Sequence, residues 1–343
     1  MKKQYNEKNE QVKTKYFEKK ARSRDPKTIE SYIKAIYEFE CSTSFADFKT
    51  FKSDQAIEFK AYLEGKKNKN TGRAISKSYF VNYLSHTKLF FLWLKDQKGY
   101  KRHIDIDDVL DFEVNRNDRR RASATVHKES YEVSDILSTI RSIPNKDVLD
   151  RRNKALISLC LLTTPRIAAL QTTTIESIKF FKHEGVYGFV QNPNSIDTKY
   201  ANNFVSYFIG DVSDIIENVV SWRQFLMDSG FTAKDPLFPK VQPSFDEDGL
   251  QIFKVEKKEI KSAETLRRVF KVVFTGNGFP YYSPHSFRHT IIGKALRTPN
   301  SDLFLSALGP NFGHALPMPT LISSYGVCPE RERAKVLKSF KLE

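Results

Sequence analysis

The sequence predicts an α+β fold that is mostly α: a helical N-terminal domain, then a larger domain of helices with a small antiparallel sheet. Three observations lead to this class. A chain of 343 residues corresponds to about two domains. From Lys27 onward, apolar residues recur near the 3.6-residue period of a helix in most segments. The segment 178–209 alternates instead and is rich in β-branched and aromatic residues, which is typical of short strands.

The N-terminal part divides into an arm and a helical domain. Residues 1–26 are charged and have no periodic apolar face, so we expect a basic arm that is disordered or folds late. Residues 27–112 form the helical domain. Its helices are expected from Lys27 to about Phe39, over Phe45–Leu63, over Ser76–Lys95 and over Ile106–Phe112.

Two basic segments of this half are candidate DNA contacts. The turn 65–72 contains Lys66, Lys67 and Lys69. Residues 113–130 have almost no apolar content, which predicts a linker between the domains. This linker contains Arg119, Arg120 and Arg121, and its charge suits it to lie along a phosphate backbone.

The C-terminal domain is expected over 131–328, with a further short helix in 329–343. Two or three strands are expected within 178–209, and residues 194–203 join the last pair. The expected helices of this part span 134–143, 150–162, 212–228, 262–275, 285–296, 303–308 and 330–340.

Charge is the first indication of function. The chain has 56 Lys and Arg against 41 Asp and Glu, a net charge of +15 and a pI near 9.5. Such an excess favours a polyanionic partner, and nucleic acid is the default candidate. The excess is concentrated before residue 129, which indicates a DNA-gripping module ahead of a second domain. The alternative is a merely solubilising surface.

Several classes are unsupported by the sequence. Three dispersed cysteines without a CxxC pair indicate neither a disulfide framework nor a zinc site, and they favour a reducing, cytoplasmic setting. The sequence contains no P-loop and no HExxH, so we expect neither a nucleotide cofactor nor a catalytic metal. It also has no apolar run near 18 residues and no secretory h-region, so no membrane partner is expected.

Phosphate-binding side chains remain as candidates for chemistry. Arg166 lies in LLTTPRIAAL, where a buried apolar helix gives way to a new start. His285 and Arg288 lie three residues apart in SPHSFRHT, on one face of a helical turn. Pro284 suits a first helical turn, so the helix N-terminus would favour an anion at the same place.

Five motifs, taken in chain order, resemble the tyrosine recombinase (phage integrase) family. They are TTPRIAAL, TK at 198–199, HSFRHT, FGH at 312–314 and SSY at 323–325. The resemblance covers about residues 27–343. A single HxxR motif is weak evidence, whereas the ordered set with a tyrosine near the end is specific. The resemblance implies a helical core-binding domain and a catalytic domain that together close on DNA as a C-shaped clamp.

The resemblance also implies roles for six residues. Arg166 and Arg288 would clamp the scissile phosphate and stabilise the charge of its transition state. Tyr325 would be the nucleophile and form a 3′-phosphotyrosyl link. Lys199 would protonate the leaving 5′-oxygen, His285 would act as general base or acid, and His314 would hydrogen-bond the phosphate.

Some positions leave alternatives open. Lys182 competes with Lys199 as the catalytic lysine, and Tyr281 and Tyr282 compete with Tyr325, although they suit a core or DNA-contacting role better. His289 suits a structural role. Ala169 replaces the acidic residue that family members usually carry three positions after the first arginine.

The function implied is that of a site-specific DNA recombinase or integrase. Its substrate would be double-stranded DNA with inverted-repeat core sites, on which four copies of the chain would form a homotetramer in synapsis. The resemblance also allows an accessory directionality factor as a partner. The helix in 329–343 would dock on a neighbouring protomer, although packing on its own domain is the alternative. A type IB topoisomerase and a catalytically inactive DNA-binding protein on the same fold are the competing functions.

Overall fold

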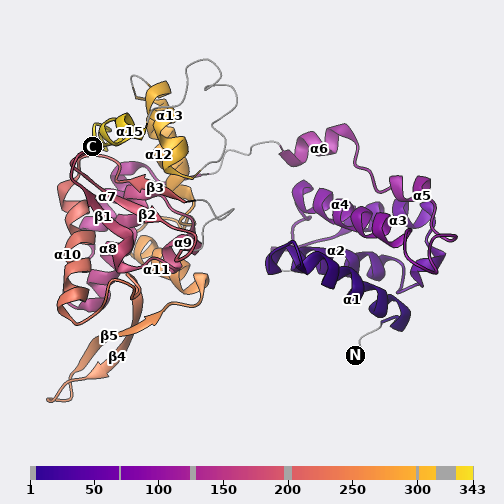
Figure 1. Ribbon diagram of the computed structural model, residues 1–343, viewed down its shortest axis with the longest axis horizontal. Coiled ribbons are helices and arrows are strands. Elements are labelled where there is room, and N and C mark those ends of the chain that lie inside the picture. Colours follow the sequence, from indigo (N-terminus) through magenta and orange to yellow (C-terminus); the bar gives the residue numbers. More distant parts are fainter. Residues whose placement is uncertain are drawn as a thin grey trace. The chain divides into compact units, whose positions relative to one another are not determined.

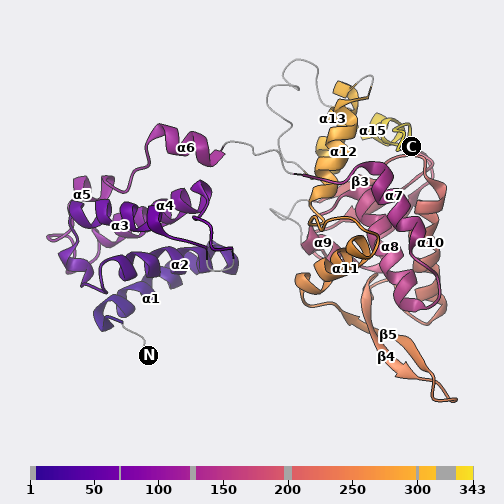
Figure 2. The ribbon, with the colours of Figure 1, turned by 180° about the vertical axis from the view of Figure 1, so that it is seen from behind.

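The computed structural model describes residues 5–68, 71–123, 129–196, 203–298, 301–313 and 330–342. The chain forms two compact units, residues 1–126 and 127–343 (Figure 1; Figure 2). The division falls within the segment where the sequence predicts a linker. Most helices are where their apolar periodicity predicts them, and the predicted class, mostly α with a small antiparallel sheet, is confirmed.

The first unit is helical. Its elements are α1 (Glu7–Ala21), α2 (Pro26–Ser42), the short 3-10 helix η1 (Phe48–Thr50), α3 (Ser53–Gly65), α4 (Lys77–Leu94), α5 (Ile106–Leu110) and α6 (Arg116–Ser123). Helices α2 and α4 pack against each other, and aromatic rings fill the core. Phe39 from α2 contacts Phe91 from α4 at a centroid distance of 5.0 Å, and Phe51 contacts the same ring at 4.1 Å.

The expectation of a disordered or late-folding arm over 1–26 is wrong for the described part, because residues 7–21 form α1. Val12 and Tyr16 are buried, and Lys13 Nζ lies 2.5 Å from Glu40 Oε2 of α2. Asn9 donates to Glu40 Oε1 and accepts from the Phe48 amide. The helix is therefore attached through polar side chains, which an apolar periodicity does not detect.

Two further expectations for this unit need correction. The helix expected over Phe45–Leu63 is interrupted, because Ser44 and Phe45 have positive φ and η1 comes before α3. The predicted linker 113–130 is not irregular throughout. Its residues 116–123 form α6, which packs on α4, where the Ser78 hydroxyl donates to the Ala122 carbonyl and Lys77 pairs with Asp118.

The second unit contains eight described α-helices and two sheets. The helices are α7 (Val133–Ser142), α8 (Val148–Thr163), α9 (Ile167–Gln171), α10 (Ser213–Asp228), α11 (Ala263–Gly276), α12 (Ser286–Leu296) and α13 (Ser301–Asn311), followed by a C-terminal α15 (Glu330–Lys338). After the 3-10 helix η2 (Ile175–Ser177), the strands β1 (Ile178–Phe181), β2 (Val186–Gln191) and β3 (Phe204–Tyr207) form an antiparallel sheet in the order β1-β2-β3.

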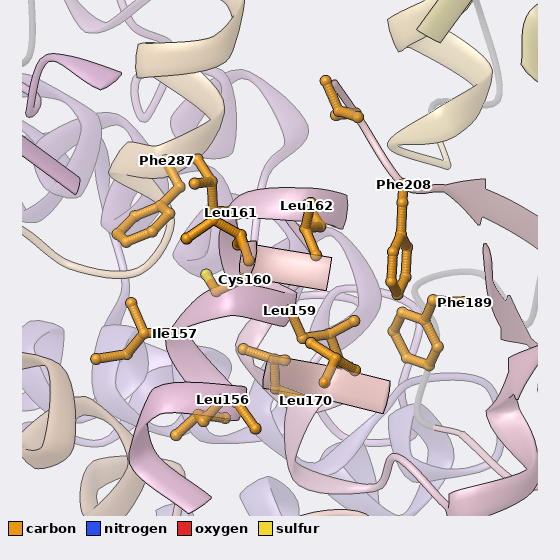
Figure 3. Close-up of a cluster of buried hydrophobic side chains, with 14 of the residues drawn as sticks. Leu156, Ile157, Leu159, Cys160, Leu161, Leu162, Leu170, Phe189, Phe208 and Phe287 are labelled. Atoms are coloured by element: carbon orange, nitrogen blue, oxygen red, sulfur yellow. The ribbon is translucent and has the colours of Figure 1, made fainter. Parts of the chain in front are cut away.

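Helix α8 runs through the core of this unit. Every residue from Ala155 to Thr163 is buried, so this half of the helix is enclosed on all sides, and α7, α10 and β3 pack against the helix. Figure 3 shows Leu156, Leu159 and Leu162 of α8 together with Leu170 of α9, Phe189 of β2 and Phe287 of α12. This packing fixes where α8 ends, and the arginine motif follows directly.

A second sheet was not predicted from the sequence. Strands β4 (Pro239–Phe245) and β5 (Gln251–Glu259) form a two-stranded antiparallel hairpin that extends away from the rest of the unit (Figure 1; Figure 2). The signal available was the turn DEDG between two alternating segments, a typical hairpin connection.

The C-terminal helix packs on its own unit, which is the alternative to docking on a neighbouring protomer. Leu337 and Phe340 are buried in the core, and Phe340 contacts the Phe304 ring of α13 at 5.0 Å. The Gly210 amide donates to the Leu337 carbonyl. Leu342 lies so close to Gly210, whose φ is +83°, that a Cβ there would clash.

The described helices contain no segment that is both long and apolar enough to cross a bilayer. Within the same described ranges, His, Cys, Asp and Glu residues do not gather into a group of three that could hold a metal ion.

Candidate active site

Arg166 lies at a sharp break between two helices. Helix α8 ends at Thr163, and Thr164 takes the left-handed conformation (φ 41°, ψ 49°) as its C-cap. Pro165 cannot continue the helix, because it has no amide hydrogen and restricts the residue before it. Arg166 then becomes the half-buried N-cap residue of α9.

Arg288 of α12 is buried beside this break, with 5% of its surface exposed. Its Nε donates to the Thr164 carbonyl at 2.7 Å, and its guanidinium carbon lies 5.1 Å from the centre of the Phe312 ring. Burial and, as a smaller cause, the nearby charge of Arg166 lower the pKa of Arg288 to about 10. The two arginines, distant in sequence, are therefore electrostatic neighbours.

These two cations have no anionic partner within the described part of the chain. Neither Arg166 nor Arg288 forms an ion pair there with a carboxylate. A buried charge is costly unless it is compensated, and two like charges near each other add to that cost. An oxyanion that accepts hydrogen bonds from both guanidiniums would remove the penalty, so the geometry suits phosphate binding.

His285 occupies the N-cap position of α12 and is exposed, and its ring lies 5.5 Å from that of His289. The Arg288 amide donates to the His285 carbonyl at 3.2 Å. The histidine therefore lies one helical turn before Arg288 but at the surface, where it is open to a substrate. His289 is exposed as well.

Phe312 and Gly313, which come directly before His314, lie between Arg288 and the sheet. Gly313 has a φ of +65° and lies against the Phe204 ring so closely that a Cβ there would clash. Phe204 begins β3 and ends the β2–β3 connection that carries Lys199. The flanks of both predicted residues are therefore brought together near Arg288.

Asn311 holds this arrangement, and sequence analysis missed it. Its Oδ1 accepts from the Tyr207 amide at 2.7 Å and its Nδ2 donates to the Tyr207 carbonyl at 3.0 Å. Its own carbonyl accepts from the Ser206 hydroxyl at 2.6 Å. The buried amide thus pins the end of α13 to β3. Its position directly before the FGH motif was the only signal in the sequence.

Other predicted residues are placed differently or lie outside the described residues. Four of them lie outside the described residues: Lys69, Lys199, His314 and Tyr325. Lys182 is exposed in the β1–β2 turn, at the opposite end of the sheet from the β2–β3 connection. Ala169 is buried in the core, where its carbonyl accepts from the Thr173 hydroxyl.

The predicted DNA contacts of the first unit also differ among themselves. Arg119, Arg120 and Arg121 are exposed on α6, and Lys67 is exposed as well. Lys66 is instead half-buried, with its Nζ 2.6 Å from Glu38 Oε2 and within reach of the Tyr62 hydroxyl. Its charge is already paired, so Lys66 is a poorer DNA contact than the sequence suggested.

Comparison with known proteins rests on structure alone. Neither a protein-family model nor a curated protein sequence matches the chain. Among solved structures, the XerH site-specific recombinase bound to its difH substrate matches with a TM-score of 0.55 and 16% identity, over 92% of this chain and 81% of that one. Lambda integrase (75–356), as a dimer bound to a COC' core site, matches with a TM-score of 0.57 and 13% identity, over 90% and 96%. A lambda integrase tetramer on a Holliday junction matches with a TM-score of 0.57 and 14% identity, over 90% and 78%.

The chain thus has the fold of the tyrosine recombinases, as the ordered motifs predicted. The particular proteins that it is similar to in fold include XerH and lambda integrase. At these identities the likeness concerns the fold.

Proposed function

We propose that this chain is a site-specific DNA recombinase that cuts and rejoins DNA through a 3′-phosphotyrosyl intermediate. One observation carries the proposal: Arg166 and Arg288 lie close together, one of them buried, with no carboxylate partner among the described residues. Such a pair suits the phosphate of a DNA backbone, where charge accumulates during transesterification.

In the proposed reaction the Tyr325 hydroxyl attacks the scissile phosphorus, and the bond to the 5′-oxygen breaks. Since Arg288 uses its Nε on Thr164, its two Nη groups remain for the phosphate. His285 takes the tyrosine proton, His314 donates to a phosphate oxygen, and Lys199 gives a proton to the leaving 5′-oxygen. The phosphotyrosyl bond conserves the energy of the diester, so rejoining needs no nucleotide cofactor.

Lys199 is the proposed acid because of the sheet topology. The β2–β3 connection ends at Phe204, which touches Gly313 in the segment beside Arg288. Lys182 follows β1, at the other end of the sheet. A DNA substrate with a 5′-bridging sulfur separates the two residues, since a thiolate leaves without protonation. Cleavage of that substrate should be unaffected by Lys199→Ala, which slows cleavage of the ordinary substrate, whereas Lys182→Ala should change neither rate.

The proposed substrate is double-stranded DNA with inverted-repeat core sites, bound by a homotetramer in synapsis. The solved structures of similar fold include a recombinase on its substrate and an integrase tetramer on a Holliday junction. The net charge of +15 and the exposed arginines of α6 suit a DNA partner. We propose a cytoplasmic protein that acts at the DNA, with an accessory directionality factor as a further partner.

The test is a suicide substrate with a nick near the cleavage point, because loss of the short fragment traps a covalent adduct. Sequencing the DNA in the adduct gives the target site. A failure to form any adduct would favour an inactive DNA-binding protein. Relaxation of supercoils by the monomer without strand exchange would favour a type IB topoisomerase.

A further inference from the structure

The β4–β5 hairpin has one apolar and one polar face. Directly paired residues of antiparallel strands point to the same side of a sheet. The pairs Val241–Val255, Pro243–Phe253 and Phe245–Gln251 therefore share one face. The other face carries Lys240–Glu256, Gln242–Lys254 and Ser244–Ile252.

The apolar face is uncovered towards its tip, whereas Val241, Phe253 and Val255 are half-buried. Of its apolar residues only Val255, near the base, packs against the core of the unit, in the part of the chain described here. At the tip, Phe245 is 68% exposed and Leu250 is 65% exposed. A two-stranded hairpin is marginal by itself, so exposed apolar side chains at its tip indicate a missing partner.

The hairpin edges are protected against strand addition, which leaves the face for docking. Pro239 and Pro243 lack the amide hydrogens that a further strand beside β4 would need. Lys254, Lys257 and Lys258 place charge along β5. The turn between the strands is ordered, because Asp246 Oδ1 accepts from the amides of Asp248 and Leu250.

The tip has a charge opposite to that of the chain. Asp246, Glu247 and Asp248 follow one another between the two exposed apolar residues, on a chain of net charge +15. DNA would repel three carboxylates, whereas a second copy of this chain would attract them. An apolar and cationic surface is the complement that such a tip requires.

Helix α11 offers that complement at the hairpin base, since only three residues separate it from β5. Val272 is 61% exposed and lies beside the exposed Lys271, with Arg268 one helical turn earlier. In the described structure neither cation has a carboxylate partner, whereas Arg267 pairs with Glu264. The hairpin extends about 30 Å from base to tip, as expected for nine residues of strand.

We propose that the hairpin docks on a second copy of this chain, with the tip of each copy on α11 of the other. Two hairpins related by a two-fold axis run antiparallel, which places each tip at the other's base and lets the two apolar faces cover each other. Such a contact is reciprocal and closes as a dimer. It does not depend on the proposed recombinase activity.

The experiment is a charge exchange measured by sedimentation equilibrium of the full chain without DNA. The tip variant is Glu247→Lys with Asp248→Lys, which spares the turn-forming Asp246. The helix variant is Arg268→Glu with Lys271→Glu. Each variant alone should raise the dimer Kd by about 10-fold or more, because both reciprocal contacts become repulsive. An equimolar mixture should restore a dimer of near wild-type Kd, since each tip then meets a helix of opposite charge.

The matched control is Asp54→Lys with Glu58→Lys on α3, which makes the same change in net charge at exposed positions. This control should dimerise like the wild type. A second variant, Phe245→Ser with Leu250→Ser, should also weaken the dimer, with Trp222 fluorescence showing that the unit stays folded. Three results would each overturn the proposal. They are a wild type that is still monomeric at about 100 μM, a mixture of the two variants that does not regain the dimer, and a control variant that weakens the dimer as much as they do. A tip variant that alters DNA affinity and leaves association unchanged would overturn it as well.

Discussion

The Nε of Arg288 donates to the carbonyl oxygen of Thr164 across 124 residues of sequence, at 2.7 Å. This single bond links the end of α8 to α12. It also fixes the backbone two positions before Arg166, because Thr164 precedes Pro165 and Arg166. Thr164 is strained, because a threonine in the left-handed region lacks the freedom of glycine. The bond also decides which edge of the Arg288 guanidinium remains open for an anion.

Loss of either arginine should slow cleavage much more than it weakens DNA binding. Arg166→Ala and Arg288→Ala should each cost about 100-fold or more in single-turnover cleavage, because their hydrogen bonds strengthen as charge builds on the phosphate. Lysine should rescue poorly, since it lacks the two-pronged donor geometry. The comparison is cleavage rate against DNA Kd, with Lys182→Ala as the control. Wild-type rates in both alanine variants would remove the pair from the site.

Tyr325→Phe should abolish the covalent adduct and leave DNA affinity nearly unchanged, because only one hydroxyl is lost. Tyr282→Phe is the matched control. The Tyr282 hydroxyl donates to Glu129 at 3.0 Å, so its loss should affect local packing but not adduct formation. The readout is a protease-sensitive shift of labelled DNA, and its persistence in Tyr325→Phe would contradict the assignment.

Cleavage should survive EDTA, because two guanidiniums supply the positive charge that a metal provides in many nucleases. DNA affinity should fall steeply with salt, with a slope that counts the phosphates contacted. Replacing Arg119, Arg120 and Arg121 with alanine should lower that slope, whereas Lys66→Ala should change it little, because Lys66 is paired with Glu38. Cleavage that EDTA stops and magnesium restores would indicate a nuclease.

Glu40→Gln should destabilise the first unit by on the order of 3 kcal/mol, because it leaves the buried ammonium of Lys13 with only the half-exposed Glu10 as its counter-charge. Tyr16 of α1 lies 5.1 Å from the Trp93 ring, so Trp93 fluorescence in a Trp222→Phe background reports on this unit during urea unfolding. Glu30→Gln serves as the control, since Glu30 forms only an exposed pair with Lys34. An unchanged midpoint would show that α1 is attached by other contacts.

Deletion of residues 330–343 should destabilise the second unit, rather than spare folding as a purely intermolecular helix would. Leu337, Phe340 and Leu342 belong to its core, and the single change Phe340→Ala should cost about 3 kcal/mol. Lys341→Ala, at an exposed neighbour, should cost almost nothing. Trp222 fluorescence during unfolding measures both. A truncated protein of full stability would restore the trans-docking interpretation.

The sequence predicted the helices whose apolar residues recur at regular helical spacing. Helices α4, α8 and α10 have apolar residues at helical spacing, so their ranges were predicted closely. Helix α1 was missed because Asn9 and Lys13 face the interior and are stabilised by Glu40, a contact no local pattern contains. The hairpin was missed because lysines and other polar residues interrupt the apolar alternation of both strands.

The candidate site was predictable in composition but not in geometry. The order of motifs pointed to Arg166, His285 and Arg288, whereas their grouping depends on the bond between Arg288 and Thr164. Asn311 could not be singled out, because its value lies in pairing with both backbone groups of Tyr207. Nothing in the sequence showed that Lys66 is neutralised by Glu38, 28 positions away.

The packing of Leu337 and Leu342 against Gly210 also bears on synthesis at the ribosome. The described contacts of α1 to α6 join residues within the first 123 positions, so that unit can fold while the chain is still being made. The second unit stays incomplete until residues 337–342 emerge from the exit tunnel, since they cover Gly210 and the end of the sheet. A nascent chain would then have a folded first unit well before the second is complete, and the proposed cleavage would be deferred until synthesis had passed residue 342.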